Sequence, residues 1–487
     1  MPRPADIPLI KPSDATSWSQ CRRRVWLEHY ADLGFAAPVD AFSQHLIESG
    51  IAHEQAVYQR LASTRDVQRA TSAEQTSALM AKGVEVIYQA RLVDKDNGIT
   101  GSPDFLIRHP GGEYQPADAK LSHTADKQVI QIQLGLYRRM LGARLPGIVY
   151  LGNGEQALVG DEANEVTENY ITDMRNLLAS RQQPQARYSH SKCNACAYRE
   201  HCTPEFEACE ELSLLYGINI HVAEGLEQVG IQTISQLAAS DPADIPDLPH
   251  LKNEGKKRRA VLQAKAWLSG EVFQIAPLAM PAGHWVHFDI EANPPSDGMQ
   301  EHVYLWGFLP PGYQHSDYTS IWTDQGAEDE SGWRQFLEQI ALYRQRYPDL
   351  VLVHYSNYER TTIRNYARRY GMESNHVVVY LLGPDSPLFD IQKVVKNSLV
   401  LPLQGFGLKD ICKHKQLVDF QWQDEVAGSQ WSVVQFRRFV EQQDATARQQ
   451  LKNSILKYNC DDVIATRRLE QWLRANFEVR IKGVSVD

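Results

Sequence analysis

Residues 101–120, GSPDFLIRHPGGEYQPADAK, decide the fold expected for the first part of this sequence. Two strand-like runs flank a glycine pair at 111–112, and this pattern predicts a β-hairpin. Asp118 and Lys120 are two residues apart on the second strand, so their side chains point to the same face. Pairing with the first strand can bring Asp104 to that face as well.

This combination of side chains is suited to phosphodiester hydrolysis. Two carboxylates can hold Mg²⁺ or Mn²⁺, and a lysine beside the metal favours formation of hydroxide. The metal also offsets the charge of the phosphate. The alternative is a surface hairpin with scattered charges, since a triplet such as Asp118-x-Lys120 arises easily by chance. The flanking segments favour an active site.

Those segments resemble the RecB and AddB type of nuclease in the PD-(D/E)xK superfamily. GIAHE at 50–54 is similar to the family's helix that supplies a metal-binding histidine, and QLGLY at 133–137 is similar to its Q-x-x-x-Y helix. The resemblance implies a restriction-endonuclease-like fold over residues 1–205. It assigns His53, Asp104 and Asp118 as metal ligands, with Asp104, Asp118, Lys120, Gln133 and Tyr137 as the catalytic residues.

Four cysteines bracket this region. KCNACAYREHC contains Cys193, Cys196 and Cys202, and Cys21 is the leading candidate for a fourth ligand. Clustered cysteines in a reducing compartment are typical of a metal site. Their split resembles the [4Fe–4S] cage of AddB-type and related CRISPR-associated nucleases. A four-cysteine zinc site is the alternative, because ligand type alone excludes neither metal, and Cys209 could substitute for one ligand.

Residues 206–272 look like short helices separated by glycine turns, and they resemble a helix-hairpin-helix module. The segment 251–270 carries six basic residues and one acidic residue. Such a run attracts phosphates without sequence preference, although a solvated helix is the alternative. The residues that we expect to contact nucleic acid are Lys252, Lys256, Lys257, Arg258 and Arg259.

Residues 280–487 alternate strand-like and helix-like segments, which indicates an α/β architecture. Asp289 and Glu291, in HFDIEANP, share one face of a strand. Glu359 follows the strand-like VLVHYS, and Tyr458 and Asp462 are four residues apart on a helix. Four acidic groups could hold two metal ions about 4 Å apart, while the tyrosine orients the attacking water.

This pattern resembles the RNase H-like exonucleases of the DEDDy type, in particular the YprB-like branch. The second motif of that family commonly ends in Asp, whereas Glu359 stands there in this sequence. Asp462 is preferred over Asp461 because it fits the Y-x-x-x-D spacing. Asp390 is expected to cap a helix rather than to support the metal, and Lys409 either meets a phosphate or is solvated. A degenerate fold that only binds nucleic acid is the alternative.

Composition and charge restrict the class of protein. The 487 residues are 43% hydrophobic and 23% charged, with a net charge of −10, which excludes a disordered or collagen-like chain and a globally basic nucleic-acid binder. There is no run of about 18 apolar residues, so no membrane partner is expected. The first residues lack the apolar run of a signal peptide, and we expect a cytoplasmic protein.

Together, the three regions resemble a family of bacterial RecB-like nucleases, which implies an α/β multidomain fold. The predicted function is hydrolysis of DNA, in single strands or at ends, by a Mg²⁺- or Mn²⁺-dependent nuclease. The site of Asp104, Asp118 and Lys120 is expected to be the centre of the reaction, and the C-terminal site a second, exonuclease-type centre.

Two alternatives to this function stay open. The C-terminal 3′–5′ exonuclease or ribonuclease could be the sole active site, since RNA is not excluded as a substrate. The chain could also be a noncatalytic nucleic-acid-binding subunit of a partner helicase. Such a partner would be needed for unwinding, because the sequence has no G-x-x-x-x-G-K-[ST] motif.

Overall fold

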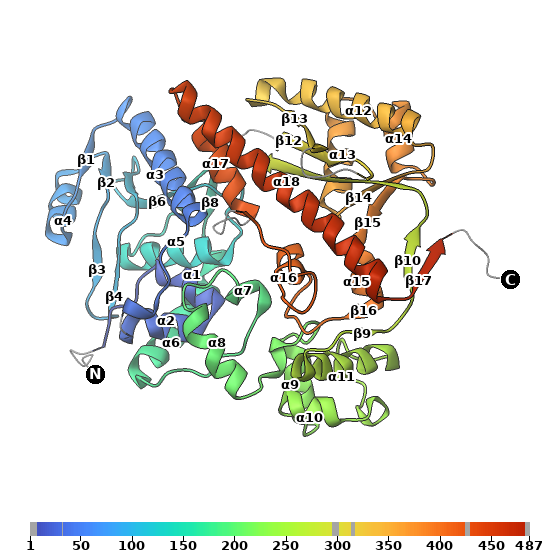
Figure 1. Ribbon diagram of the computed structural model, residues 1–487. Coiled ribbons are helices and arrows are strands. Elements are labelled where there is room, and N and C mark those ends of the chain that lie inside the picture. The colour runs from blue at the N-terminus through green and yellow to red at the C-terminus, as the bar shows by residue number, and fades with distance from the viewer. Residues whose placement is uncertain (1–6, 32, 295–300, 313–316, 424–428, 483–487) are drawn as a thin grey trace. The chain divides into compact units, whose positions relative to one another are not determined.

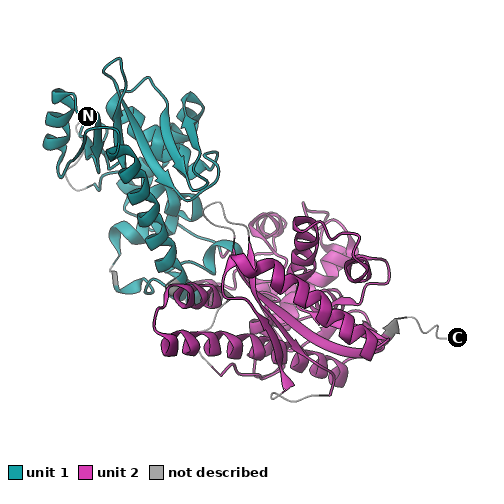
Figure 2. Cartoon of the chain, turned by 90° about the horizontal axis from the view of Figure 1, so that it is seen from above, with its two compact units in different colours: residues 1–187, 191–204, 295–300 teal, residues 188–190, 205–294, 301–487 magenta. Residues whose placement is uncertain are grey.

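The computed structural model describes residues 7–31, 33–294, 301–312, 317–423 and 429–482. The chain folds as two compact units (Figure 2). Unit 1 comprises residues 1–187, 191–204 and 295–300, and unit 2 comprises residues 188–190, 205–294 and 301–487. The segment 206–272, predicted as a connector, lies within unit 2. No helix in the described ranges is long and apolar enough to cross a membrane.

Unit 1 is built on a mixed six-stranded sheet (Figure 1). In spatial order its strands are β1 (Val67–Arg69), β2 (Val86–Tyr88), β5 (Phe105–Arg108), β6 (Tyr114–Lys120), β7 (Gly147–Leu151) and β8 (Gln156–Val159). The predicted hairpin is confirmed, because β5 and β6 are antiparallel with Phe105 opposite Ala117. β7 runs parallel to β6 after the crossover helix α5 (Gln128–Leu141).

Further helices and a small two-stranded sheet complete unit 1. The helices are α1 (Asp14–Gln20), α2 (Arg22–Tyr30), α3 (Ala41–Ala62), α4 (Ala73–Lys82) and α6 (Asn164–Ser180), with most of α7 (His190–Cys193) and α8 (Arg199–Ala208), whose residues 190 and 205–208 belong to unit 2. The small sheet pairs β3 (Leu92–Asp94) with β4 (Ile99–Gly101). One core lies under α5, where Leu134 and Tyr137 pack with Val149 of β7.

Unit 2 contains a five-stranded sheet, ordered β13-β12-β11-β14-β15. Its strands are β11 (His284–Asn293), β12 (His302–Leu309), β13 (Thr319–Trp322), β14 (Leu350–His354) and β15 (Leu388–Asp390). β12 pairs antiparallel with β11 and β13, whereas β14 is parallel to both β11 and β15. Every residue of β12 is buried, which identifies it as an internal strand.

Helices cover both faces of this sheet. One face is covered by α12 (Asp329–Arg346), α13 (Tyr358–Arg369) and α14 (His376–Leu382), and the other by α15 (Ile391–Ser398), α16 (Leu408–Cys412) and α18 (Ala445–Asn476). α17 (Ser429–Glu441) precedes α18 and packs against it and β11. α18 crosses β11 and β12 (Figure 1).

The alternating residues of β11 explain how this sheet presents its polar side chains. Val286, Phe288 and Ile290 belong to the hydrophobic core on the α12 side. Because successive side chains of a strand point to opposite faces, Asp289 and Glu291 face α18.

The rest of unit 2 is a helical segment and small strand pairs. The helices are α9 (Ile220–Gln228), α10 (Ile234–Ala239) and α11 (Glu254–Ser269). The strand pairs are β10 (Leu278–Pro281) with β17 (Val479–Lys482) and β9 (Phe273–Gln274) with β16 (Leu399–Val400). The predicted short helices of 206–272 are thus present.

Candidate metal centre

Three carboxylates converge between β11 and α18. Asp289, Glu291 and Asp462 each offer an oxygen, and these oxygens all lie within 4.8 Å of one another. The two residues from β11 share a face, and α18 brings Asp462 to them. We call these three residues the acidic triad. They are three of the four carboxylates that the sequence predicted for this site.

Each carboxylate of the acidic triad accepts a hydrogen bond from a neutral side chain. The donors are Asn459 Nδ2, 2.7 Å from Asp289 Oδ2; Ser432 Oγ, 2.5 Å from Glu291 Oε2; and Trp422 Nε1, 2.6 Å from Asp462 Oδ1. Such partners orient a carboxylate and leave its other oxygen for a metal ion. Sequence reasoning missed all three donors.

The electrostatics of the acidic triad favour a cation. Burial, followed by the charges of the other acidic residues, raises the pKa of Asp289 well above its usual range. Burial and Asp462 raise the pKa of Glu291 to about 8, and burial raises that of Asp462 to about 6. Carboxylates that repel one another in a buried site hold protons until a positive ion replaces them.

Glu359 lies beside the acidic triad rather than within it. It occupies the first turn of α13, only 2% exposed, with Oε2 3.2 Å from Nδ1 of His354. Burial raises the pKa of Glu359, and its charge contributes to the raised pKa of Asp289. The fourth predicted carboxylate is therefore near the site, held by a histidine that the sequence did not single out.

Tyr458 and Lys409 lie next to the acidic triad. Lys409 Nζ lies 3.1 Å from the Tyr458 hydroxyl and 4.5 Å from the centre of its ring. Burial lowers the pKa of Lys409, while the Asp462 charge acts to raise it. Lys409 is therefore not a solvated surface residue. It places a positive charge next to the acidic triad.

Two other acidic residues have structural partners. Asp461 accepts hydrogen bonds from the backbone N–H and the side-chain amide of Gln423, at 2.9 and 3.1 Å. The preference for Asp462 over Asp461 agrees with this arrangement. Asp390 caps α15 by accepting from the backbone N–H of Lys393, as predicted.

Gly307 leaves the space in which Asn459 reaches Asp289. It lies opposite Asp289 on β12, and a Cβ atom there would collide with the Asn459 amide oxygen and the Tyr318 hydroxyl. These two groups are themselves hydrogen bonded, at 2.7 Å. A side chain at this position would therefore displace the amide that orients Asp289.

We expect Gly307→Ala to lower the free energy of unfolding by about 1–3 kcal/mol, as overpacking of a filled core does, and to reduce metal affinity. Urea unfolding and metal titration would measure the two effects. Gly326→Ala is the matched control, because a Cβ at Gly326 meets nothing within 4 Å. Equal stability of the two variants would contradict this role of Gly307.

The hairpin of unit 1 brings its three predicted residues together. Lys120 Nζ lies 2.9 Å from Asp118 Oδ2. Asp104 Oδ2 accepts from the backbone N–H of Ala119 at 2.8 Å. Burial and the Asp118 charge raise the pKa of Asp104 well above its usual range. Burial acts to lower the pKa of Lys120, but the two carboxylates outweigh it and leave that pKa raised.

The other residues predicted for the hairpin site have different surroundings. Tyr137 is buried, and Asp118 and Asp104 add to the effect of burial in raising its pKa. Gln133 Nε2 lies 3.4 Å from the backbone oxygen of Pro12. His53 Nε2 lies 3.0 Å from the backbone oxygen of Tyr150, on β7.

On α3, Glu54 lies near the predicted hairpin site as well as His53. The charge of Glu54 contributes to the raised pKa of Asp104, so this carboxylate is close to the hairpin residues. Its neighbour His53 points toward β7. Sequence reasoning missed Glu54, and His53 as a metal ligand stays a prediction.

The four cysteines of unit 1 do not form a closed metal site. Burial raises the pKa of Cys202, and the thiols of Cys196 and Cys21 contribute, so these three are neighbours. Within the described residues, however, no three cysteine sulfur atoms come within 4.8 Å of one another. The assignment of Cys21, Cys193, Cys196 and Cys202 to iron–sulfur or to zinc stays a prediction.

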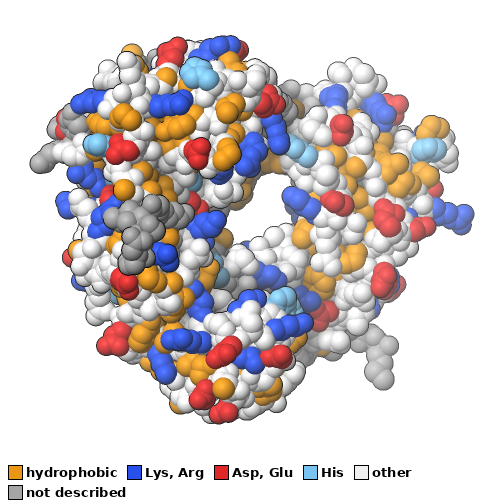
Figure 3. All heavy atoms as spheres, turned by 90° about the vertical axis from the view of Figure 1, so that its right-hand side faces the viewer, with side chains coloured by type: hydrophobic (Ala, Val, Ile, Leu, Met, Phe, Trp, Pro, Cys, Tyr) orange, Lys and Arg blue, Asp and Glu red, His pale blue; other side chains and the backbone are white. Residues whose placement is uncertain are grey.

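The basic run of α11 is partly engaged inside unit 2. Lys257 Nζ pairs with Asp247 Oδ1 at 2.8 Å, and Arg259 donates to the backbone oxygen of Leu399 at 2.9 Å. The exposed basic residues of the segment 251–270 are Lys252, Lys256, Arg258 and Lys265. Figure 3 shows basic and acidic side chains interspersed over the face that it draws.

Comparison with known protein families gives a match in the second half of the chain. Residues 286–474 match the RNase H superfamily, in the family RNase_H_2. This range contains the acidic triad, Glu359 and Tyr458. It gives no support to a PD-(D/E)xK domain in unit 1, which stays a prediction. No curated protein matches the sequence.

Proposed function

We propose that this protein is a divalent-metal-dependent nuclease whose reaction takes place at the acidic triad. The observation that carries the proposal is the convergence of three carboxylate oxygens within 4.8 Å, inside a domain of the RNase H superfamily. Sequence reasoning placed the centre of the reaction at Asp104, Asp118 and Lys120. The support from the family match now favours the C-terminal site.

The residues of the acidic triad fit a hard divalent cation. Their donors are carboxylate oxygens, the ligands that Mg²⁺ and Mn²⁺ prefer. Their pKa values are raised by burial and mutual repulsion, which a cation would relieve. When bound, such an ion supplies charge that offsets the phosphate and lowers the pKa of the attacking water.

The side chains around the acidic triad have separate tasks in this proposal. Asn459, Ser432 and Trp422 fix the carboxylates by donating to them. The Tyr458 hydroxyl orients the attacking water, as the DEDDy resemblance implies. The Lys409 ammonium, next to that hydroxyl, stabilises the negative charge that develops on the phosphate. Glu359, held by His354, adds a further negative charge beside the acidic triad.

The substrate in this proposal is DNA, as single strands or ends. Its cleavage should require metal. We expect end-labelled single-stranded DNA to be cut with Mn²⁺, to survive in chelator, and to be cut again when Mn²⁺ is restored. An RNA strand of the same sequence, run beside it, tests the preference for DNA. DNA that is bound but never cut with any metal would favour a noncatalytic binding subunit of a partner helicase in place of this proposal.

A second hydrolytic centre in unit 1 is favoured by a specific observation. Asp104, Asp118 and Lys120 are in contact through the hairpin, and the pKa of Asp104 is strongly raised. In this second proposal, Asp104 and Asp118 hold the metal, Glu54 adds a nearby negative charge, and Lys120 favours hydroxide. It would cut the same class of substrate as the acidic triad.

We also propose that Cys21, Cys193, Cys196 and Cys202 hold a [4Fe–4S] cluster in unit 1, with zinc as the alternative. Metal binding by residues from both ends of a domain contributes to its folding. We expect Cys196→Ala to remove the visible absorption of an iron–sulfur thiolate site and to lower solubility. Cys460→Ala, which alters a buried cysteine of unit 2, is the control. Colourless wild-type protein with stoichiometric zinc, prepared without oxygen, would contradict the cluster.

A further inference from the structure

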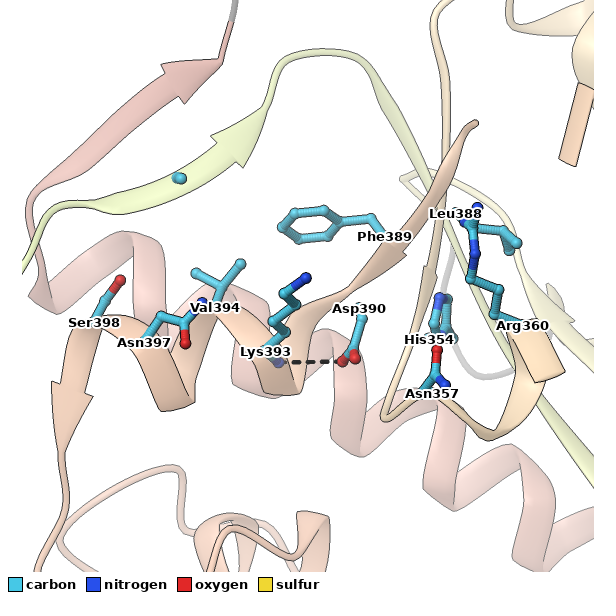
Figure 4. A pocket seen from close by; sticks show the side chains of 11 residues that line it. His354, Asn357, Arg360, Leu388, Phe389, Asp390, Lys393, Val394, Asn397 and Ser398 are labelled. Atoms are coloured by element: carbon cyan, nitrogen blue, oxygen red, sulfur yellow. Dashed lines mark hydrogen bonds between the residues drawn. The ribbon is translucent and has the colours of Figure 1, made fainter. Parts of the chain in front are cut away.

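A cavity of about 410 Å³ lies at the carboxyl ends of β14 and β15, outside the acidic triad (Figure 4). The last residues of the two strands, His354 and Asp390, both line it. These strands are parallel, and their following helices diverge: α13 packs on the face of Phe288 and α15 on the opposite face, with Trp285. In open α/β sheets, a crevice at such a divergence is the usual place for a ligand.

Two cations enter the cavity from opposite sides. Arg360 comes from α13 and Lys393 from α15 (Figure 4). Arg360 donates to a serine hydroxyl at 3.1 Å and to a backbone carbonyl at 3.2 Å, both uncharged. Over the described ranges, neither cation is paired with a carboxylate. Asp390, the acidic residue of the lining, accepts from two backbone N–H groups at 3.2 Å. Both cations can therefore pair with a bound anion.

The remaining lining suits a nucleobase. Phe389, which is 9% exposed, lines the cavity, and its ring is held edge-on against Trp285 with the centroids 5.1 Å apart. Aromatic side chains contact the bases of single strands in their binding sites. Asn357 and Asn397 add amide groups, which can donate and accept hydrogen bonds at the edge of a base.

His354 connects the cavity with the acidic triad. Its Nδ1 lies 2.6 Å from the backbone oxygen of Ser356 and 3.2 Å from Glu359 Oε2. The same imidazole lines the cavity. A ligand there would therefore be a close neighbour of the carboxylate beside the acidic triad.

We propose that this cavity binds one nucleotide, with its phosphate between Arg360 and Lys393 and its base against Phe389. The same chemistry is offered by a nucleotide unit of a bound strand and by a free nucleoside monophosphate. The strand is the favoured source because His354 lines the cavity and also contacts Glu359, the carboxylate beside the acidic triad, and this source rests on the proposed nuclease function. The cavity would then hold a nucleotide next to the one being cleaved and set the register of the strand.

The test compares full-length wild type with Lys393→Ala, an exposed position whose truncation should not disturb the core. Binding of a fluorescent single strand is measured in chelator, where it is not cut, over a range of salt concentrations. We expect Lys393→Ala to weaken binding about fivefold, the upper range for one exposed ion pair, and to reduce the salt slope by about 0.7, the value for one phosphate contact on a single strand. Lys393→Arg should restore both.

Lys396→Ala is the matched control on the same helix. Its Nζ donates to Gln392 at 2.9 Å, and the residue does not line the cavity. We expect it to bind the strand like wild type. Equilibrium dialysis with deoxyadenosine monophosphate distinguishes the two sources. Binding of the free nucleotide that depends on Lys393 supports a free ligand. Dependence on Lys393 that is seen only with the strand supports the strand.

Unchanged binding of both probes by Lys393→Ala would overturn the cavity as a nucleotide site. That outcome is distinct from a failure of the proposed function. Wild type that cleaves with Mn²⁺ while Lys393→Ala binds normally would retain the nuclease and reject the cavity. Wild type that never cleaves, but binds in a Lys393-dependent way, would reject the nuclease and retain the cavity.

Discussion

Asp289→Asn is expected to abolish metal-dependent cleavage while making the metal-free protein more stable. The substitution removes a metal ligand, so we expect the rate to fall at least about 100-fold, the scale on which electrostatic stabilisation of the transition state acts. It also removes a carboxyl group that, without metal, must either stay charged beside repelling carboxylates or take up a proton on folding. We therefore expect the free energy of unfolding at pH 8, in chelator, to rise on the order of 1 kcal/mol.

Cleavage kinetics and unfolding in chelator measure the two effects of Asp289→Asn. Asp461→Asn is the matched control, since Asp461 is bonded to Gln423 and lies outside the acidic triad. That variant should lose stability and keep its cleavage. Loss of cleavage with a gain in stability identifies a functional carboxylate, whereas retained cleavage with a loss of stability identifies a structural one. Wild-type cleavage by Asp289→Asn would contradict the role of the acidic triad.

Divalent metal is expected to stabilise the protein more at pH 8 than at pH 6. The folded protein has raised pKa values, about 8 for Glu291 and about 6 for Asp462, whereas unfolded carboxyl groups titrate near pH 4. From about pH 5 to 8 the metal-free folded state thus holds protons that the unfolded state has lost. Its stability falls as pH rises, by about 1.4 kcal/mol per pH unit for each such proton.

The metal reverses this loss, because it binds the deprotonated carboxylates of the folded state. Melting temperatures with Mg²⁺ and with chelator, at pH 6, 7 and 8, give the difference directly. We expect the metal-induced increase to grow with pH, and Glu291→Gln to flatten that growth. An increase of the same size at every pH would show that the raised carboxyl groups are not the metal ligands.

The part of the site that local patterns determine could be predicted from the sequence. The alternation in HFDIEA places Asp289 and Glu291 on one face of β11, since a strand has a period of two. The spacing of Tyr458 and Asp462 places both on one side of α18. The hairpin of unit 1 was likewise visible in its glycine pair and flanking strands. These features depend on neighbours in the chain.

Features that depend on distant segments could not be predicted in this way. Ser432 and Trp422 reach the acidic triad from segments remote from β11, and their sequence context gives no signal. Asn459 is different: its position between Tyr458 and Asp462, on a predicted helix of the site, could have drawn attention to it. Its partner Asp289 is nevertheless 170 positions away.

The rotation of a helix and the pairing of surface charges could not be predicted from the sequence, for the same reason. On α3, His53 and Glu54 are adjacent, so about 100° of helix rotation decides which one faces the hairpin. Tertiary packing sets that rotation. In the basic run of α11, Lys257 is paired with Asp247. A count of charges along the segment cannot detect such a partner.

The most direct test of the central claim is Mn²⁺-dependent cleavage of end-labelled single-stranded DNA by Lys120→Ala beside Asp289→Asn. The account predicts that Lys120→Ala still cuts the strand, because the acidic triad is intact, and that Asp289→Asn does not. Inert Lys120→Ala together with active Asp289→Asn would contradict the account and place the reaction at Asp104, Asp118 and Lys120 in unit 1.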